Sequence, residues 1–174
     1  VMARLFKSAY RILSKESLML PSLVLTIRLF STVGTTEAIT SSIAAKKVSD
    51  LKQRVKIVNE TENAVLISIH QNTFPDSRYH GPQVFYADDE ISETVAQKLQ
   101  TQLVSALDPD SNRKCKSSSG IYLMRNILKP GILIECGFLT NPEEEARLRA
   151  AAYQKKLVSI IAVSVSRQIN QEIM

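Results

Sequence analysis

The chain has 174 residues, 44% of them hydrophobic, and a formal net charge of +5. This is enough material for one globular domain with its own core, and a second domain is not required. The excess charge lies in residues 1–47, which carry seven basic and two acidic residues, whereas residues 48–174 carry fifteen of each. The balanced charge of the main part, without a helix-turn-helix or RNA-binding pattern, argues against a nucleic-acid partner.

The first 45 residues differ from the rest of the chain. Residues 1–15 place apolar side chains on one helical face with basic residues between them. This pattern predicts a basic amphipathic helix that could make weak contact with a membrane surface. We therefore expect an atypical basic segment over residues 1–45 and a main domain over residues 46–174.

A second apolar run, from Leu18 to Phe30, is interrupted by Pro21 and Arg28. It is shorter than the ~20 residues that cross a bilayer, and it lacks the cleavage site of a clear signal peptide. Its middle, residues 23–28, predicts a strand. The first residue is Val1 rather than Met, which suggests a fragment.

From residue 46 onward the pattern becomes regular. Apolar residues at helical spacing predict a helix that ends near Val58, and a strand follows over residues 64–72. This strand places His70 and Asn72 at its C-terminal end, where ligands bind in open α/β sheets. A structural role for His70, as the cap of a neighbouring loop, is the alternative.

The middle of the chain continues the alternation. Residues 83–86 predict a strand, and apolar residues at four-residue intervals predict a helix over residues 91–103 that ends before Asp108. Residues 121–124 are expected to be extended. His80 lies in the polar loop before the strand, where we expect a solvated side chain.

The second chemical signal is Glu135, inside the apolar strand Gly131–Phe138. An unpaired charge in such a strand is costly, so the carboxyl group should have a raised pKa or lie beside a cation. Both arrangements suit catalysis, and a structural salt bridge is the alternative. Cys115 and Cys136 are too few for a disulfide framework, and we interpret both as incidental thiols.

The last elements are helices. Asn141 and Pro142 predict the cap and first position of a helix, and Glu144 stands where the acid of a capping box would. Residues 152–173 carry apolar side chains at four-residue steps and predict a helix that covers the sheet.

Apolar strands that alternate with amphipathic helices predict an α/β fold. We expect a mainly parallel, twisted sheet of five to six strands with helices on both faces. His70 and Glu135 each end a strand and could face one crevice. Since no Ser or Cys is placed as a nucleophile beside His70, the residues indicate a hydrolytic site that uses a metal.

Three runs of sequence carry a resemblance to a known family: LKQRVKIVNETENAVLISIHQN, GPQVFYA and ILIECGFLTNPEEEARL. Over residues 46–170 the chain resembles the zinc-dependent N-acetylmuramoyl-L-alanine amidases of bacterial cell walls, most closely the spore-cortex, germination-specific branch. Residues 46–174 would then be an amidase-like catalytic domain. The first strand of the family is missing or replaced here.

The resemblance implies one Zn²⁺ per chain and hydrolysis of the amide between N-acetylmuramic acid and the L-alanine of the stem peptide. His70 would be a zinc ligand. Glu135 would activate the zinc-bound water and pass its proton to the leaving amine, and Asn72 would contact substrate. The implied partner is peptidoglycan, the implied location is the cell wall, and a monomer is expected.

The chain departs from the family at its N-terminus. Members carry a Gly-His-Gly element and a later ligand Glu, and nothing in Val1–Ser22 matches; Glu16 has a different context. Only His70 of three expected ligands stands in its motif. Three hypotheses remain: an amidase with an altered N-terminus, a non-catalytic peptidoglycan-binding homologue that lacks two zinc ligands, and a structural module anchored by its N-terminal helix.

Overall fold

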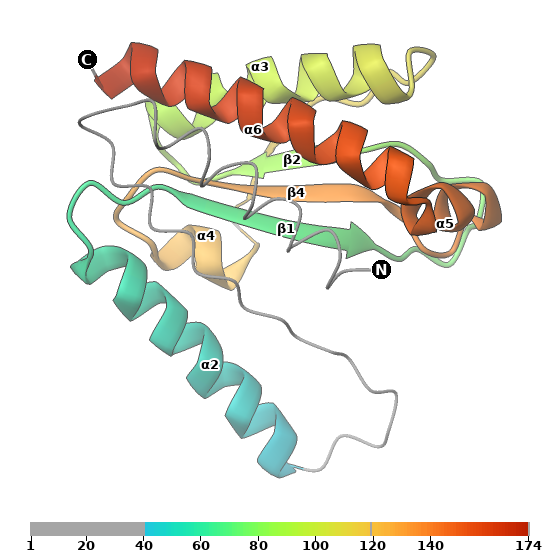
Figure 1. The fold of residues 1–174 in the computed structure, drawn as a ribbon. Coiled ribbons are helices and arrows are strands. Elements are labelled where there is room, and N and C mark those ends of the chain that lie inside the picture. Colours follow the sequence, from blue (N-terminus) through green and yellow to red (C-terminus); the bar gives the residue numbers. More distant parts are fainter. Residues whose placement is uncertain (1–40, 119, 174) are drawn as a thin grey trace.

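The structure is a computed structural model that describes residues 41–118 and 120–173, in which helices and strands alternate (Figure 1). The elements in chain order are α2 (Ser41–Glu60), β1 (Leu66–Asn72), β2 (Gln83–Tyr86), α3 (Glu90–Leu107), β3 (Lys116–Ser117), α4 (Tyr122–Asn126), β4 (Gly131–Phe138), α5 (Pro142–Arg149) and α6 (Ala151–Ile173). The long strands and helices therefore fall where the sequence predicts them.

The four strands of the described residues form one sheet in the order β1-β4-β2-β3. β4 runs parallel to β1 and antiparallel to β2, and β3 runs parallel to β2. The carboxyl ends of β1 and β4 therefore lie at the same edge of the sheet as the start of β2. The expected parallel character is only partly confirmed, and four strands are seen in this part where five to six were expected.

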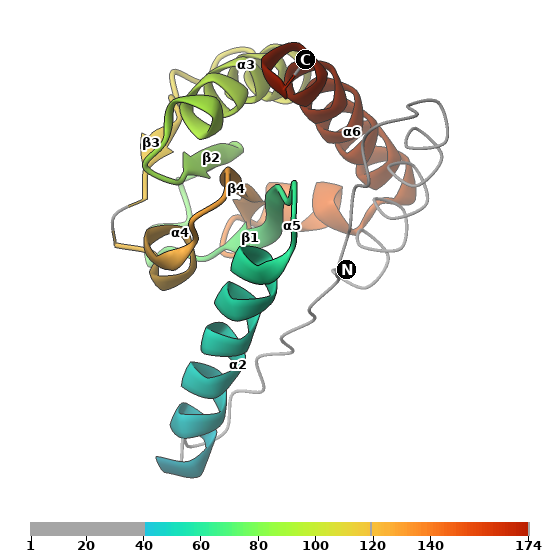
Figure 2. The same cartoon turned by 90° about the vertical axis from the view of Figure 1, so that its left-hand side faces the viewer.

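Helices cover both faces of the sheet, as predicted (Figures 1 and 2). On one face α3 and α6 pack on Ile132 and Ile134 of β4 in the larger core cluster. On the other face α2 and α4 pack on Leu133 of the same strand. Because successive side chains of a strand point to opposite faces, Glu135 shares the face of Leu133.

The sequence accounts for the limits of α3. Its cap is Asp89, whose side chain accepts a hydrogen bond of 2.8 Å from the backbone N–H of Ser92. The helix ends at Leu107, before Asp108, and its residues Val95, Leu99 and Leu103 are buried. A local cap at the start and one apolar stripe define this helix.

The extended conformation expected for residues 121–124 is wrong, because Tyr122–Asn126 forms the helix α4. Five residues are too few to show a helical period in the sequence. Packing decides the conformation here, since Leu123 and Met124 are both buried against α2 and the sheet.

The amphipathic helix predicted for residues 1–15 and the strand predicted for residues 23–28 lie outside the described residues. The expected boundary between residues 45 and 46 falls within α2, and the division of the chain there stays a prediction. Among the helices that the structure describes, none is long and apolar enough to cross a membrane.

Candidate functional site

The two residues predicted to carry chemistry are direct neighbours across two strands. His70 of β1 stands in register with Glu135 of β4, and Gln83 of β2 is the partner of Glu135 on the other side. Side chains of residues paired in this way project from the same face of a sheet. The structure therefore brings His70 and Glu135 together in one polar row, on the face covered by α2 and α4, and adds Gln83 to it.

Glu135 is a carboxyl group held in an apolar strand. Its Oε2 atom is buried and accepts no hydrogen bond from any described residue. Burial raises the pKa of Glu135 from its ordinary value of 4.5 to about 7. The raised pKa was one of the two expected outcomes, and both protonation states are accessible near neutral pH.

His70 is held by its own strand. Its Nε2 atom lies 2.9 Å from the hydroxyl of Ser68, two residues earlier in β1, so a serine does lie beside His70, contrary to the expectation from the sequence. Burial and, second, the positive charge of Arg54 on α2 lower the pKa of the imidazole below its ordinary value of 6.5. The ring is therefore neutral at pH 7, which is the form that binds a metal.

Asn72 marks the point where β1 and β4 leave their regular register. Its side-chain oxygen accepts a hydrogen bond of 2.8 Å from Thr73 N–H, and its carbonyl oxygen accepts one of 2.8 Å from Leu139 N–H. The register shifts between His70 and Asn72, and Gly137 opposite has a φ of +151°. Asn72 closes the end of the strand here, and substrate contact by its side chain stays a prediction.

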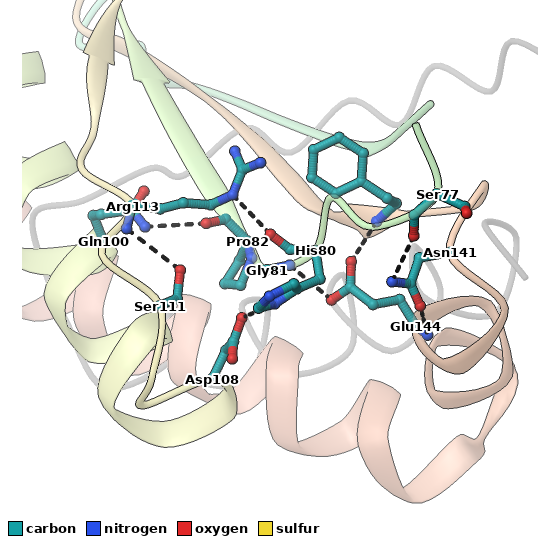
Figure 3. Close-up of polar contacts among 11 residues, drawn as sticks. Ser77, His80, Gly81, Pro82, Gln100, Asp108, Ser111, Arg113, Asn141 and Glu144 are labelled. Atoms are coloured by element: carbon teal, nitrogen blue, oxygen red, sulfur yellow. Dashed lines mark hydrogen bonds and ion pairs between the residues drawn. The ribbon is translucent and has the colours of Figure 1, made fainter. Parts of the chain in front are cut away.

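The loop of residues 73–82 leaves β1 beyond these residues and is fixed by the start of α5 (Figure 3). Glu144 is only 3% exposed, and its carboxylate accepts hydrogen bonds from Gly81 N–H at 3.0 Å and from Phe138 N–H at 2.7 Å. Asn141 donates from its amide to the carbonyl oxygen of Ser77 at 3.0 Å. One glutamate thus joins the loop to the end of β4.

The start of α5 is as predicted, but the role expected for Glu144 is wrong. Asn141 caps the helix by accepting hydrogen bonds from Glu143 N–H and Glu144 N–H at 3.0 and 3.1 Å. A capping box would also turn the Glu144 carboxylate back to Asn141 N–H, which instead donates to the carbonyl oxygen of Phe138. The Glu144 carboxylate binds the backbone amides of Gly81 and Phe138 instead.

The other side of the loop is fixed by residues that follow α3 (Figure 3). The ring of His80 lies 2.7 Å from the carboxylate of Asp108. The guanidinium of Arg113 donates to the carbonyl oxygen of His80 and to the side chain of Gln83, both at 2.7 Å. His80 is exposed, as the sequence predicts, although its ring contacts Asp108. The sequence assigns no role to Arg113, because the hydrogen-bond partners of its side chain are far away in the chain.

The donor set of the site fits a metal only in part. The neutral imidazole of His70 and the unpartnered oxygen of Glu135 suit a zinc site in their chemistry. Within residues 41–118 and 120–173, however, no three His, Cys, Asp or Glu side chains gather closely enough to hold a metal ion. Glu16, the other acid considered from the sequence, lies outside these ranges.

Comparison with protein families matches residues 25–167 to the family described as N-acetylmuramoyl-L-alanine amidase, Amidase_3. The germination-specific N-acetylmuramoyl-L-alanine amidase of Bacillus subtilis is 40% identical over 134 residues, which are 76% of this chain and 56% of that protein. The matched part thus spans little more than half the length of this relative, and only 23% of the length of the N-acetylmuramoyl-L-alanine amidase LytC of Bacillus subtilis, which is 25% identical.

Solved structures give the same result. The CwlD amidase of Clostridioides difficile, in complex with the GerS lipoprotein, aligns over 97% of this chain and 84% of its own, with a TM-score of 0.80 and 28% identity. An N-acetylmuramoyl-L-alanine amidase of Clostridium difficile 630 aligns over 69% of this chain and 65% of its own, with a TM-score of 0.62 and 30% identity. These similarities do not favour a non-catalytic homologue.

Proposed function

The chain belongs to the Amidase_3 family of N-acetylmuramoyl-L-alanine amidases, and from this membership we propose that it hydrolyses the amide between N-acetylmuramic acid and L-alanine in peptidoglycan. We assign Glu135 as the residue that moves the proton. The observation that carries this assignment is the pair of His70 and Glu135, in register on one face of the sheet, with burial raising the pKa of Glu135 to about 7.

Glu135 suits a reaction that needs both a base and an acid. In the attack on the amide carbonyl, its ionised form would take a proton from water as the new C–O bond forms. As the C–N bond breaks, its protonated form would return the proton to the leaving nitrogen of L-alanine. A pKa near the working pH serves both steps, and such proton transfer contributes about 10²- to 10⁴-fold in rate.

Zinc is the cofactor that the family suggests, and we assign His70 as one ligand. When bound, Zn²⁺ supplies a Lewis acid that polarises the carbonyl and lowers the pKa of water. No three His, Cys, Asp or Glu side chains of the described residues gather into a metal site, so the ligands that complete it would come from residues outside them. Burial keeps His70 neutral and its contact with Ser68 restrains its ring, which prepares it for binding.

The remaining assignments come partly from the relatives and partly from the sequence alone. We assign peptidoglycan as the partner, with Asn72 near the substrate, and a location outside the cytoplasmic membrane. Residues 1–45 would form a basic segment that contacts the membrane surface weakly through residues 1–15, and residues 46–174 the catalytic domain. The chain would act as a monomer.

The proton-transfer role is tested by Glu135→Gln, which keeps the size of the side chain but cannot take up a proton. With purified peptidoglycan, the wild-type chain should release free amino groups of L-alanine without new reducing sugar ends. The variant should be slower by at least about 10²-fold. The exposed Glu143→Gln serves as control, and a Glu135→Gln variant that cleaves at the control rate would refute the assignment.

The metal assignment is tested by the zinc content of the purified chain after buffer exchange. We expect about one zinc per chain, as in catalytic sites of this type. His70→Ala should lose the zinc, whereas His80→Ala, which replaces the chain's other histidine, should retain it. Equal zinc content in both variants would exclude His70 as a zinc ligand. A wild-type chain without zinc would contradict the assignment of zinc as the cofactor.

A further inference from the structure

A small apolar surface lies next to the candidate site and takes no part in the chemistry proposed above. It consists of Phe74, Tyr79 and Leu139, which we call the aromatic ledge. Their exposed fractions are 44%, 46% and 38%. The described residues contain six exposed large hydrophobic side chains, and three of them gather here. Such a gathering marks a binding surface more often than scattered exposed residues do.

The ledge stands at the edge of the sheet that carries His70 and Glu135. Phe74 follows His70 by four residues, which limits the distance between their Cα atoms to about 14 Å. Leu139 follows Glu135 by the same number of residues. Phe74 N–H donates to the hydroxyl of Thr140 at 3.1 Å, which holds the two sides of the ledge together.

The two rings of the ledge are held in place before any ligand arrives. Phe74 and Tyr79 have their ring centroids 4.4 Å apart at an angle of 53°. Tyr79 also lies 6.2 Å from the ring of the buried Phe138, and the guanidinium of Arg113 lies 4.7 Å above that ring. Preorganised rings lose little entropy on binding, so exposed aromatic area of this kind favours affinity.

The backbone beneath the rings is fixed as well. Gly81 has a φ of +87°, and a Cβ atom there would lie 2.6 Å from the Asp108 carboxylate. Only glycine fits this position, where the loop passes between Asp108 and Glu144 (Figure 3). The loop is thus built as a rigid support.

The charged side chains of the loop have partners close by. Arg78 and Asp76 form an ion pair at 2.6 Å, and His80 lies 2.7 Å from Asp108. What the ledge offers a ligand is therefore aromatic and aliphatic surface with one tyrosine hydroxyl. This chemistry fits an uncharged ring with an apolar face better than a charged peptide.

We propose that the aromatic ledge binds a sugar ring of the glycan strand, on the sugar side of the bond that is cleaved. The axial C–H groups of a pyranose form an apolar face that packs on aromatic rings, while its hydroxyl groups remain at the edge for hydrogen bonds. The inference rests on the proposed function, because the substrate of that reaction has a sugar on one side of the amide. The ledge would fix the strand while the amide reaches Glu135.

The test uses the absence of tryptophan from the chain. Phe74→Trp places one fluorescent reporter on the ledge, and the probe is a peptide-free tetramer of β-1,4-linked N-acetylglucosamine. We expect a saturable blue shift of the emission. Leu128→Trp is the control, because Leu128 is 84% exposed and precedes β4 at the opposite edge of the sheet. No shift at position 74, an equal shift at position 128, or a shift only with a free stem peptide would overturn the proposal.

A second measurement separates this proposal from the proposed reaction. Phe74→Ala with Tyr79→Ala should weaken binding of the tetramer by about tenfold, since each ring contributes to stacking. Leu128→Ala should leave it unchanged. The Glu135→Gln variant should still bind the tetramer. Retained binding without hydrolysis would therefore still support sugar binding by the aromatic ledge. Unchanged binding of the tetramer by the double alanine variant would refute sugar binding by the aromatic ledge, even if the wild-type chain hydrolyses peptidoglycan.

Discussion

Removal of the Glu144 side chain should destabilise the protein more than removal of almost any other charged group. Its carboxylate is buried and accepts two hydrogen bonds, from Gly81 N–H at 3.0 Å and Phe138 N–H at 2.7 Å. A hydrogen bond to a charged group contributes about 1.5–3 kcal/mol. After subtraction of the cost of burying the carboxylate, we expect Glu144→Ala to lower the free energy of unfolding by about 3–5 kcal/mol.

A smaller change at the same position should give a smaller loss of stability. Glu144→Gln keeps one acceptor oxygen and turns the other into an amide that cannot accept, so one backbone N–H loses its partner. We expect about half the loss, or about 2 kcal/mol. In a chain of this size, 1 kcal/mol corresponds to a change in Tm of about 2–4 °C, so the alanine variant should melt about 10 °C lower.

Urea unfolding followed by circular dichroism measures these differences. Hydrogen exchange of the Gly81 and Phe138 amides shows whether the loop is released locally. The control is Glu143→Ala, in the same turn of α5 but exposed, which should cost less than about 1 kcal/mol. If Glu144→Ala cost no more than the control and left both amides protected, the carboxylate would not be what holds the loop to β4.

Three further changes test other parts of the structure. Because the pKa of Glu135 is raised from 4.5 to about 7 by burial, the folded state binds this proton more tightly than the unfolded state. In metal-free protein the contribution of Glu135 to stability should be fully present below about pH 4.5 and fall by about 2–3 kcal/mol as the pH rises to 7. The difference in stability between the wild-type chain and Glu135→Gln, measured by urea unfolding with a chelator, should therefore change by this amount over the same pH range. Gly137→Ala should cost about 1–3 kcal/mol in thermal unfolding, because φ is +151° and the new Cβ would lie 3.1 Å from the Glu144 carboxylate oxygens, whereas Gly120→Ala, with nothing within 4 Å, should cost far less. Leu99→Ala, at a fully buried position of α3, should cost about 2–5 kcal/mol in urea unfolding, and a loss below 1 kcal/mol would contradict the packing described.

The candidate site could be predicted from the sequence because its signals are local. His70 and Glu135 each interrupt an apolar strand near its end, and the ends of parallel strands meet at one edge of a sheet. Their alignment in register could not be predicted, because it depends on β4 pairing with β1 across a long stretch of chain.

The antiparallel pairing of β2 with β4 could not be predicted from the sequence either. Alternating strands and helices favour parallel neighbours, and nothing local in residues 83–86 shows the direction of the strand. The roles of Glu144 and Arg113 were missed for a similar reason. Glu144 stands in a helix-start pattern that suggests a different role, and Arg113 stands in no recognisable pattern. The hydrogen-bond partners of both side chains are brought together only by the tertiary fold.

The order of the strands has a consequence for how the protein is made. β4 lies between β1 and β2 in the sheet but begins at residue 131, whereas β1 begins at residue 66 and β2 at residue 83. During translation both earlier strands must leave the ribosome with the edges that face β4 still open. Such non-local pairing slows folding and exposes the nascent chain to aggregation. A premature stop before β4 would therefore yield an aggregation-prone product rather than a smaller folded domain.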